Sequence, residues 1–287
     1  MIHPAGRPTH GRVDHAPMRI AIRVVAGVFA LLWALPGFGF VDLAVTIDPD
    51  ALWRPVAILD GGWGLLVTAF IVIGLVLVAL QPAWSAEIAA QLAGVAAVIA
   101  VSAVVTGEYE VWWMLVALIV PIGALAGLAA LGRRQATLRP RPAPDRSWVQ
   151  WAYAGLAALG AVPWLVYAVD MYRATREGRP PEEITNNVNH WAIQGALAVT
   201  LVGFTVLAAV RPTLRRFNAV RVGVCAAYLG VCSLRFPGVA GGLAREWAAL
   251  AIAWGVALLA VAIVAGRPAA RPVEQSGVPS AGRRSDH

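Results

Sequence analysis

Eight apolar segments, each close to the length of a transmembrane helix, constrain the fold of this chain most strongly. The hydrocarbon core of a bilayer needs about 20 apolar residues per helix. Lipid cannot hydrogen-bond to exposed backbone groups, so segments of this length cross it as helices. The sequence therefore predicts an all-α, polytopic transmembrane helix bundle of eight spans. We expect them at Ile20–Val41, Trp63–Leu80, Ala86–Val105, Val111–Leu131, Val149–Val169, Trp191–Val210, Asn218–Leu234 and Trp247–Ala265.

The composition agrees with lipid as the main solvent. Hydrophobic residues make up 59% of the 287 positions, charged residues make up 14%, and the mean hydropathy is +0.68. All 23 basic residues are arginine, and the net charge is +7. A nucleic-acid-binding domain needs a clustered basic face with aromatic or polar readers, whereas these arginines flank apolar segments. We therefore expect membrane lipid as a partner, and no nucleic acid.

The arginines also predict the orientation in the membrane. In an eight-span arrangement the tails and the loops after the fourth and sixth spans share one side, and these are the Arg-rich segments. Since cytoplasmic loops carry an excess of Arg and Lys, both termini are predicted to be cytoplasmic, in a bacterial inner membrane. The predicted divisions are a tail (1–18), a four-helix half (19–132), an Arg/Pro-rich linker (133–147), a second four-helix half (148–266) and a tail (267–287).

The two halves share a sparse pattern. Pro36 and Pro163 lie in the outer third of the first helix of each half, and an aspartate follows each helix. An offset near 130 residues places Asp60 opposite His190. Two parallel four-helix repeats would explain this pattern, and such repeats build binding sites between their halves. Chance similarity between two Ala/Val-rich halves is the alternative.

The most informative polar residues stand where the second and sixth spans begin. His190 and Gln194 are four residues apart and share one helix face. With Asp60 and Glu183 they predict a ligand-binding, outward-facing polar cavity, because ionisable groups in a membrane turn toward protein or water. The alternative is that His190 caps its helix and faces lipid headgroups, while Asp60 only complements the helix dipole.

Other chemistry finds little support in the residues. His190 is the only histidine outside the tails, and scattered carboxylates give no metal-ligand spacing, so we predict no metal and no cofactor. A transmembrane haem would need a pair of axial histidines, and retinal a lysine. On the inner side, Arg221 is expected to pair with Glu87, which shares one face of the third predicted helix with Gln91. A structural role for this pair is favoured over the alternative, a gate on the cytoplasmic side.

A four-span half with an acidic residue, Asp60, at the lip of its second helix resembles the DoxX-type four-helix membrane modules. The whole chain resembles uncharacterised polytopic membrane proteins of actinobacteria. Neither resemblance transfers catalytic residues. The leading hypothesis is small-molecule binding or transport. The alternatives are a membrane-embedded enzyme acting on a lipid or isoprenoid at the outer leaflet, with Asp48, Asp60 or Glu183 as acid/base groups, and an accessory subunit of a membrane complex.

Overall fold

The computed structural model describes residues 16–134, 147–180, 184–185 and 188–266. Within these residues, eight helical segments are long and apolar enough to cross a membrane, which confirms the predicted eight-span, all-α fold. In order they are α1 (Ala16–Ala34) with α2 (Gly39–Val45); α3 (Ala57–Leu65), η1 (Leu66–Val72) and α4 (Ile73–Leu80); η2 (Pro82–Trp84) with α5 (Ser85–Thr106); η3 (Tyr109–Val111) with α6 (Trp112–Arg134); α7 (Ser147–Glu177); α8 (His190–Val210); α9 (Arg215–Arg235); and α10 (Arg245–Ala265). Strands β1 (Ile184–Thr185) and β2 (Val188–Asn189) pair antiparallel just before α8.

Two helix boundaries differ from the predicted ones in ways that affect the site. The second span begins at Ala57 rather than Trp63, so Asp60 lies inside the first turn of α3. The fifth span continues to Glu177, so Asp170 is a helical residue, where its carboxylate lies 3.3 Å from Arg179. Hydropathy predicts the lipid-facing length of a helix and not its full length, so both helices extend beyond the predicted spans.

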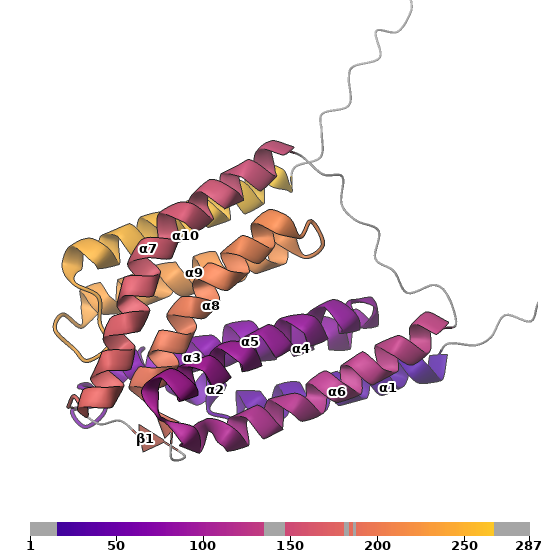
Figure 1. The fold of residues 1–287 in the computed structure, drawn as a ribbon, viewed down its shortest axis with the longest axis horizontal. Coiled ribbons are helices and arrows are strands. Elements are labelled where there is room, and N and C mark those ends of the chain that lie inside the picture. Colours follow the sequence, from indigo (N-terminus) through magenta and orange to yellow (C-terminus); the bar gives the residue numbers. More distant parts are fainter. Residues whose placement is uncertain (1–15, 135–146, 181–183, 186–187, 267–287) are drawn as a thin grey trace, which may run out of the picture.

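The three intramembrane prolines act differently. The first span breaks after Ala34, next to Pro36, and Phe38 adopts the left-handed conformation with φ 61°. At Gly37 a Cβ atom would lie 2.8 Å from the Trp33 carbonyl oxygen, so this break requires glycine. Pro121 and Pro163 instead lie inside continuous helices, α6 and α7. Figure 1 shows α7 bending along its length, as expected for a proline that removes a helical hydrogen bond.

The helices of each half contact one another in the same cyclic order. In the first half α1 packs on α4 and α6, and α5 packs on α4 and α6; in the second, α7–α8, α8–α9, α9–α10 and α10–α7 are in contact. The halves meet where α8 packs against α3 and α5, and where α9 packs against α3 (Figure 1). We call this interface the seam.

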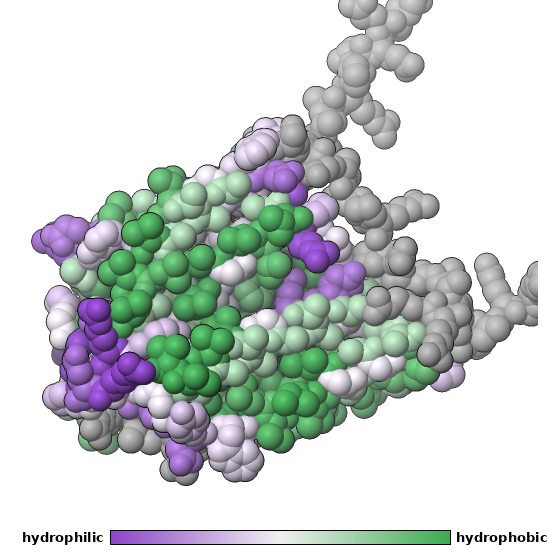
Figure 2. All heavy atoms as spheres, in the orientation of Figure 1, coloured by the Kyte–Doolittle hydropathy of each residue, from purple (hydrophilic) through white to green (hydrophobic). Residues whose placement is uncertain are grey.

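The seam is the most enclosed part of the bundle. Every residue from Ala57 to Val72 is buried, and so is the first half of α8. By contrast, α1, α6 and α10 present large exposed aliphatic side chains. Figure 2 shows hydrophobic side chains gathered across the middle of one face, with hydrophilic ones toward its ends. A membrane would cover that hydrophobic middle, and the seam would lie inside the bundle away from lipid.

Candidate functional site

The structure brings Asp60 and His190 together across the seam. The His190 Nδ1 atom lies 3.1 Å from the Asp60 Oδ1 atom, and the two side chains are 0% and 4% exposed. They come from different halves, since Asp60 lies in α3 and His190 begins α8. Both residues stand at the lips of their spans, as the sequence indicated. The pair is nevertheless enclosed by protein and does not face the outside.

Local structure explains why His190 turns inward. Asn189 is the N-cap of α8, and its side-chain oxygen accepts a hydrogen bond of 3.0 Å from the Trp191 backbone N–H. Asn189 also pairs with Ile184 in the short β-ribbon that leads into the helix. With the cap supplied by Asn189, the His190 side chain is free to point into the bundle. The arrangement therefore differs from the alternative in which His190 caps the helix and faces headgroups.

Trp63 packs against one side of the Asp60–His190 pair. Its ring stacks on the His190 imidazole with centroids 5.2 Å apart and planes 22° from parallel. The indole N–H donates a 3.0 Å hydrogen bond to the Gly37 carbonyl at the break in the first span. The conformation of that break therefore fixes Trp63, and Trp63 in turn holds the imidazole plane.

Gln194 lies beside the pair and has its own partners. Its Nε2 atom donates a 2.7 Å hydrogen bond to the Tyr167 hydroxyl, which donates to the Gly241 carbonyl. The Gln194 oxygen lies against Gly62, where a Cβ atom would be only 1.3 Å away. The space in front of Gly62 is therefore taken by the Gln194 side chain. Tyr167 was not predicted as a site residue, because an aromatic residue in an apolar span does not indicate which side chain it will contact.

Two polar atoms at this site lack a partner among the described residues: His190 Nε2 and Gln194 Oε1. A buried polar atom without a hydrogen bond costs about 1–3 kcal/mol. Each such atom in a native structure calls for an explanation, and a ligand or a water molecule that completes the hydrogen bond is one. Glu183, the fourth predicted site residue, lies outside the described residues.

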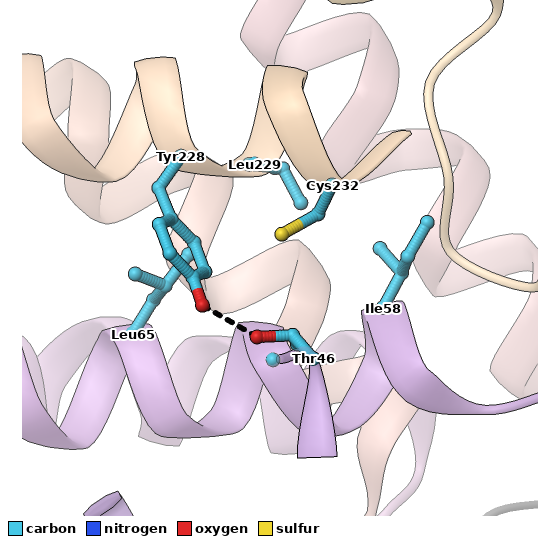
Figure 3. Close-up of a pocket in the computed structure, with 7 residues that line it drawn as sticks. Thr46, Ile58, Leu65, Tyr228, Leu229 and Cys232 are labelled. Atoms are coloured by element: carbon cyan, nitrogen blue, oxygen red, sulfur yellow. Dashed lines mark hydrogen bonds between the residues drawn. The ribbon is translucent and has the colours of Figure 1, made fainter. Parts of the chain in front are cut away.

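Asp60, His190 and Gln194 are buried in the described part of the chain, and their side chains are not open to the outside. A small cavity there lies between α3 and α9, and it has no room for a water molecule. Figure 3 shows Tyr228, Leu229 and Cys232 reaching from α9 toward Thr46, Ile58 and Leu65, with a 2.5 Å hydrogen bond joining the Tyr228 and Thr46 hydroxyls. Asp60, His190 and Gln194 do not line it, because Trp63, Tyr167 and Gly62 pack directly against their side chains.

A second buried polar cluster lies farther along the seam, around Arg221 of α9. Its guanidinium donates to the carbonyl oxygen of Ala69 at 3.2 Å and to the side-chain oxygens of Gln91 and Asn218, both at 2.5 Å. Arg221 was expected to pair with Glu87, and this was wrong. Gln91, one turn farther along the same face of α5, is the partner instead.

The two clusters share a sequence relationship. Asp60 and His190 are 130 residues apart, and so are Gln91 and Arg221. Each contact joins a residue of the first half to one of the second. This is the offset that the sequence pattern suggested, and a two-fold axis along the seam would relate the partners of each contact. The repeat itself stays a prediction, since the broken first span and the continuous α7 differ.

No family model, no curated protein and no solved structure matches the chain. The fold and composition define its class: a polytopic α-helical integral membrane protein. The resemblance to DoxX-type modules stays a prediction.

Proposed function

We propose that this protein binds or transports a small polar solute at the seam, and that protonation of the Asp60–His190 pair controls access. The observation that carries the proposal is this buried pair, which joins the two halves and leaves His190 Nε2 without a partner in the described residues. The solute would enter at the outer end of the seam, where α3 and α8 both begin.

A purely structural role accounts less well for this pair. Apolar residues of similar volume usually hold a buried interface as well as an ion pair does, or better. Ionisable residues inside membrane bundles are rare, and they commonly belong to substrate or proton pathways. Histidine is also the side chain whose ordinary change of charge falls between pH 5 and 8. These considerations favour a regulated contact over a fixed one.

The proposed cycle uses the contacts of the described, closed arrangement. Protonated His190 attracts the Asp60 carboxylate, and this attraction holds α3 against α8. When the imidazole loses its proton, a hydrogen bond replaces the ion pair and the contact weakens. Separation of the two helices would then expose His190 Nε2 and Gln194 Oε1 to a solute. We therefore expect the open form to gain population as the pH rises.

Within the described residues, Asp60 is the one acidic or basic side chain that forms a hydrogen bond or an ion pair with His190. Trp63 stacks on the ring, and the Gln194–Tyr167 contact lies one turn deeper. Protonation of the imidazole is thus expected to act mainly on the contact between α3 and α8. An enzyme at this site would need further acid/base groups that converge on the Asp60–His190 pair.

The test measures the distance between the halves as a function of pH. Spin labels would replace Tyr109 and Trp247, which are 68% and 51% exposed and belong to different halves. The buried Cys225 and Cys232 would be replaced by alanine so that only the two labels react. In lipid nanodiscs, electron–electron double resonance should give one short distance near pH 5 and an added longer distance near pH 8.

His190→Gln is the informative variant, because it keeps a polar side chain that cannot be protonated. Its distance distribution should not change with pH. Asp170→Asn is the control, since it removes an exposed carboxylate that pairs with Arg179, and it should behave as the parent protein does. A parent distribution that is the same at both pH values would refute proton-controlled opening. So would a pH response that survives in His190→Gln.

A further inference from the structure

The cluster around Arg221 carries a positive charge that nothing in the described residues neutralises. Arg221 is 4% exposed, and its three hydrogen-bond partners are neutral oxygens. In the described part of the chain, no Asp or Glu oxygen lies within 4.0 Å of an Arg221 side-chain nitrogen, because the ion pairs found there involve Arg179 and His190. A buried cation is expensive unless a charge of opposite sign accompanies it. Intramembrane arginines of this kind usually serve a ligand pathway.

Two unpaired donors stand next to this charge. Arg221 Nε and Asn218 Nδ2 are buried and have no acceptor among the described residues. The two residues are three positions apart on α9 and therefore share a face. Their side chains are already in contact, since Asn218 Oδ1 accepts from Arg221 Nη2. The missing partner must accept hydrogen bonds, and the uncompensated charge favours an acceptor that is negative.

The surroundings keep water away from the guanidinium. The rings of Phe70, Phe204 and Phe217 lie 5.5, 4.9 and 4.1 Å from its central carbon, close enough for cation–π attraction. The first of these rings comes from η1, a π-helical segment, and so does the Ala69 carbonyl that Arg221 binds. π-Helical turns shift the backbone hydrogen bonds and are common at functional sites. In such a dry site an ion pair is much stronger than in water.

An anion could be drawn to this place from the end of the bundle where α9 begins. Arg215 and Arg216 are the first two residues of α9, one to two turns before Arg221. Consecutive spans run in opposite directions, so this end lies opposite the one at which His190 begins α8. Basic residues at the mouth of a site raise the local concentration of anions.

We propose that Arg221 and Asn218 form a binding site for one anionic group, a carboxylate or a phosphate. Gln91, which comes from the other half, occupies Arg221 Nη2 when the site is empty, and the anion competes with its amide oxygen. A soluble anion and the phosphate of an anionic lipid offer the same chemistry. This site involves other residues than the Asp60–His190 pair, and it does not depend on the protonation of His190.

The test uses the whole protein in nanodiscs of phosphatidylcholine, with radiolabelled acetate and inorganic phosphate as probes in equilibrium dialysis. The parent protein should bind one equivalent of at least one probe saturably. Asn218→Asp is nearly isosteric and places a carboxylate beside Arg221, so it should weaken binding about tenfold or more. Gln91→Glu should do the same from the other half, which covers the case in which one variant does not fold.

Gln81→Glu is the matched control, because it adds the same charge at an exposed position. It should bind the probes as the parent does. Nanodiscs containing phosphatidylglycerol distinguish the two sources of the anion: loss of probe binding there assigns the site to a lipid phosphate, and unchanged binding assigns it to a soluble anion.

Native mass spectrometry follows the lipid itself. If the lipid is the occupant, the parent protein and the Gln81→Glu variant should both retain more phosphatidylglycerol than the Asn218→Asp variant does. Two results would overturn the proposal. One is no saturable probe binding together with no retained phosphatidylglycerol. The other is equal binding by Asn218→Asp, Gln91→Glu and Gln81→Glu.

Discussion

Replacing Gly62 with alanine should disrupt the seam at one defined contact. A Cβ atom at Gly62 would lie 1.3 Å from the Oε1 atom and 2.5 Å from the Cδ atom of Gln194. Atoms do not approach so closely, so the Gln194 side chain must move. It has little freedom to do so, because it is 0% exposed and its Nε2 atom is bound to Tyr167.

The size of the effect follows from two costs. Overpacking a close-packed core destabilises it by about 1–3 kcal/mol. Loss of the Gln194–Tyr167 hydrogen bond adds about 0.5–1.5 kcal/mol. Alanine returns roughly 0.5–1 kcal/mol, since glycine is the poorer helix former. We expect Gly62→Ala to lower the free energy of unfolding by about 0.5–4 kcal/mol once these opposing contributions are combined.

The assay is reversible unfolding in mixed detergent micelles, arranged as a double-mutant cycle. Gln194→Ala removes the colliding atoms, so adding Gly62→Ala to that background should cost almost nothing and leave a clear coupling energy. Gly123→Ala is the control, because a Cβ atom there meets nothing within 4 Å. If Gly62→Ala were as harmless as Gly123→Ala, or if its cost were the same with and without Gln194, the described contact between α3 and α8 would be wrong.

Two further predictions concern the loops. Burial, and secondly the neighbouring Glu110, raise the pKa of Glu108 above its ordinary 4.5. The free energy of unfolding should therefore fall as the pH rises from about 4.5 through the raised pKa, and it should stay lower at higher pH. Thermal unfolding of Glu108→Gln, measured as a function of pH, should lack this decline. Reporter fusions after Arg146 and Arg216 should read cytoplasmic, whereas fusions near Glu110 and Glu182 should read external; one reversed reading would contradict the predicted orientation.

The sequence predicted the spans well because lipid imposes one requirement on every segment: enough apolar residues to cover the hydrocarbon core. It located the ends less well. Nothing in the apolar pattern distinguishes Ala57 from Trp63 as a helix start, and Val56, the N-cap residue of α3, supplies no side-chain cap that would mark the start in the sequence. The expectation that Asp60 lies opposite His190 came from the offset between the halves, and the structure places the two side chains in contact.

Other parts of the site depend on packing that leaves no pattern in the chain. Arg221 could reach Glu87 or Gln91, which share a helix face, and the register between α5 and α9 decides for Gln91. The π-helical segment that presents the Ala69 carbonyl to Arg221 has no sequence signature. Tyr167 reaches Gln194 only because Gly62 leaves room for that side chain. Each of these contacts joins different helices, and the contacts of Arg221 with Ala69 and Gln91 join the two halves of the chain.

The central claim is that the Asp60–His190 pair is a functional contact, and proton movement tests this claim most directly. Protein in proteoliposomes would be loaded with a pH-sensitive dye, and small polar solutes would be added one at a time, neutral and anionic ones alike. If His190 releases and regains its proton in each cycle of opening and closing, at least one transported solute should drive a proton flux. His190→Gln and Asp60→Asn should abolish this flux, and Asp170→Asn should keep it. No proton flux with any solute would contradict the transport form of this proposal, and a proton flux that is unchanged in His190→Gln would contradict the central claim.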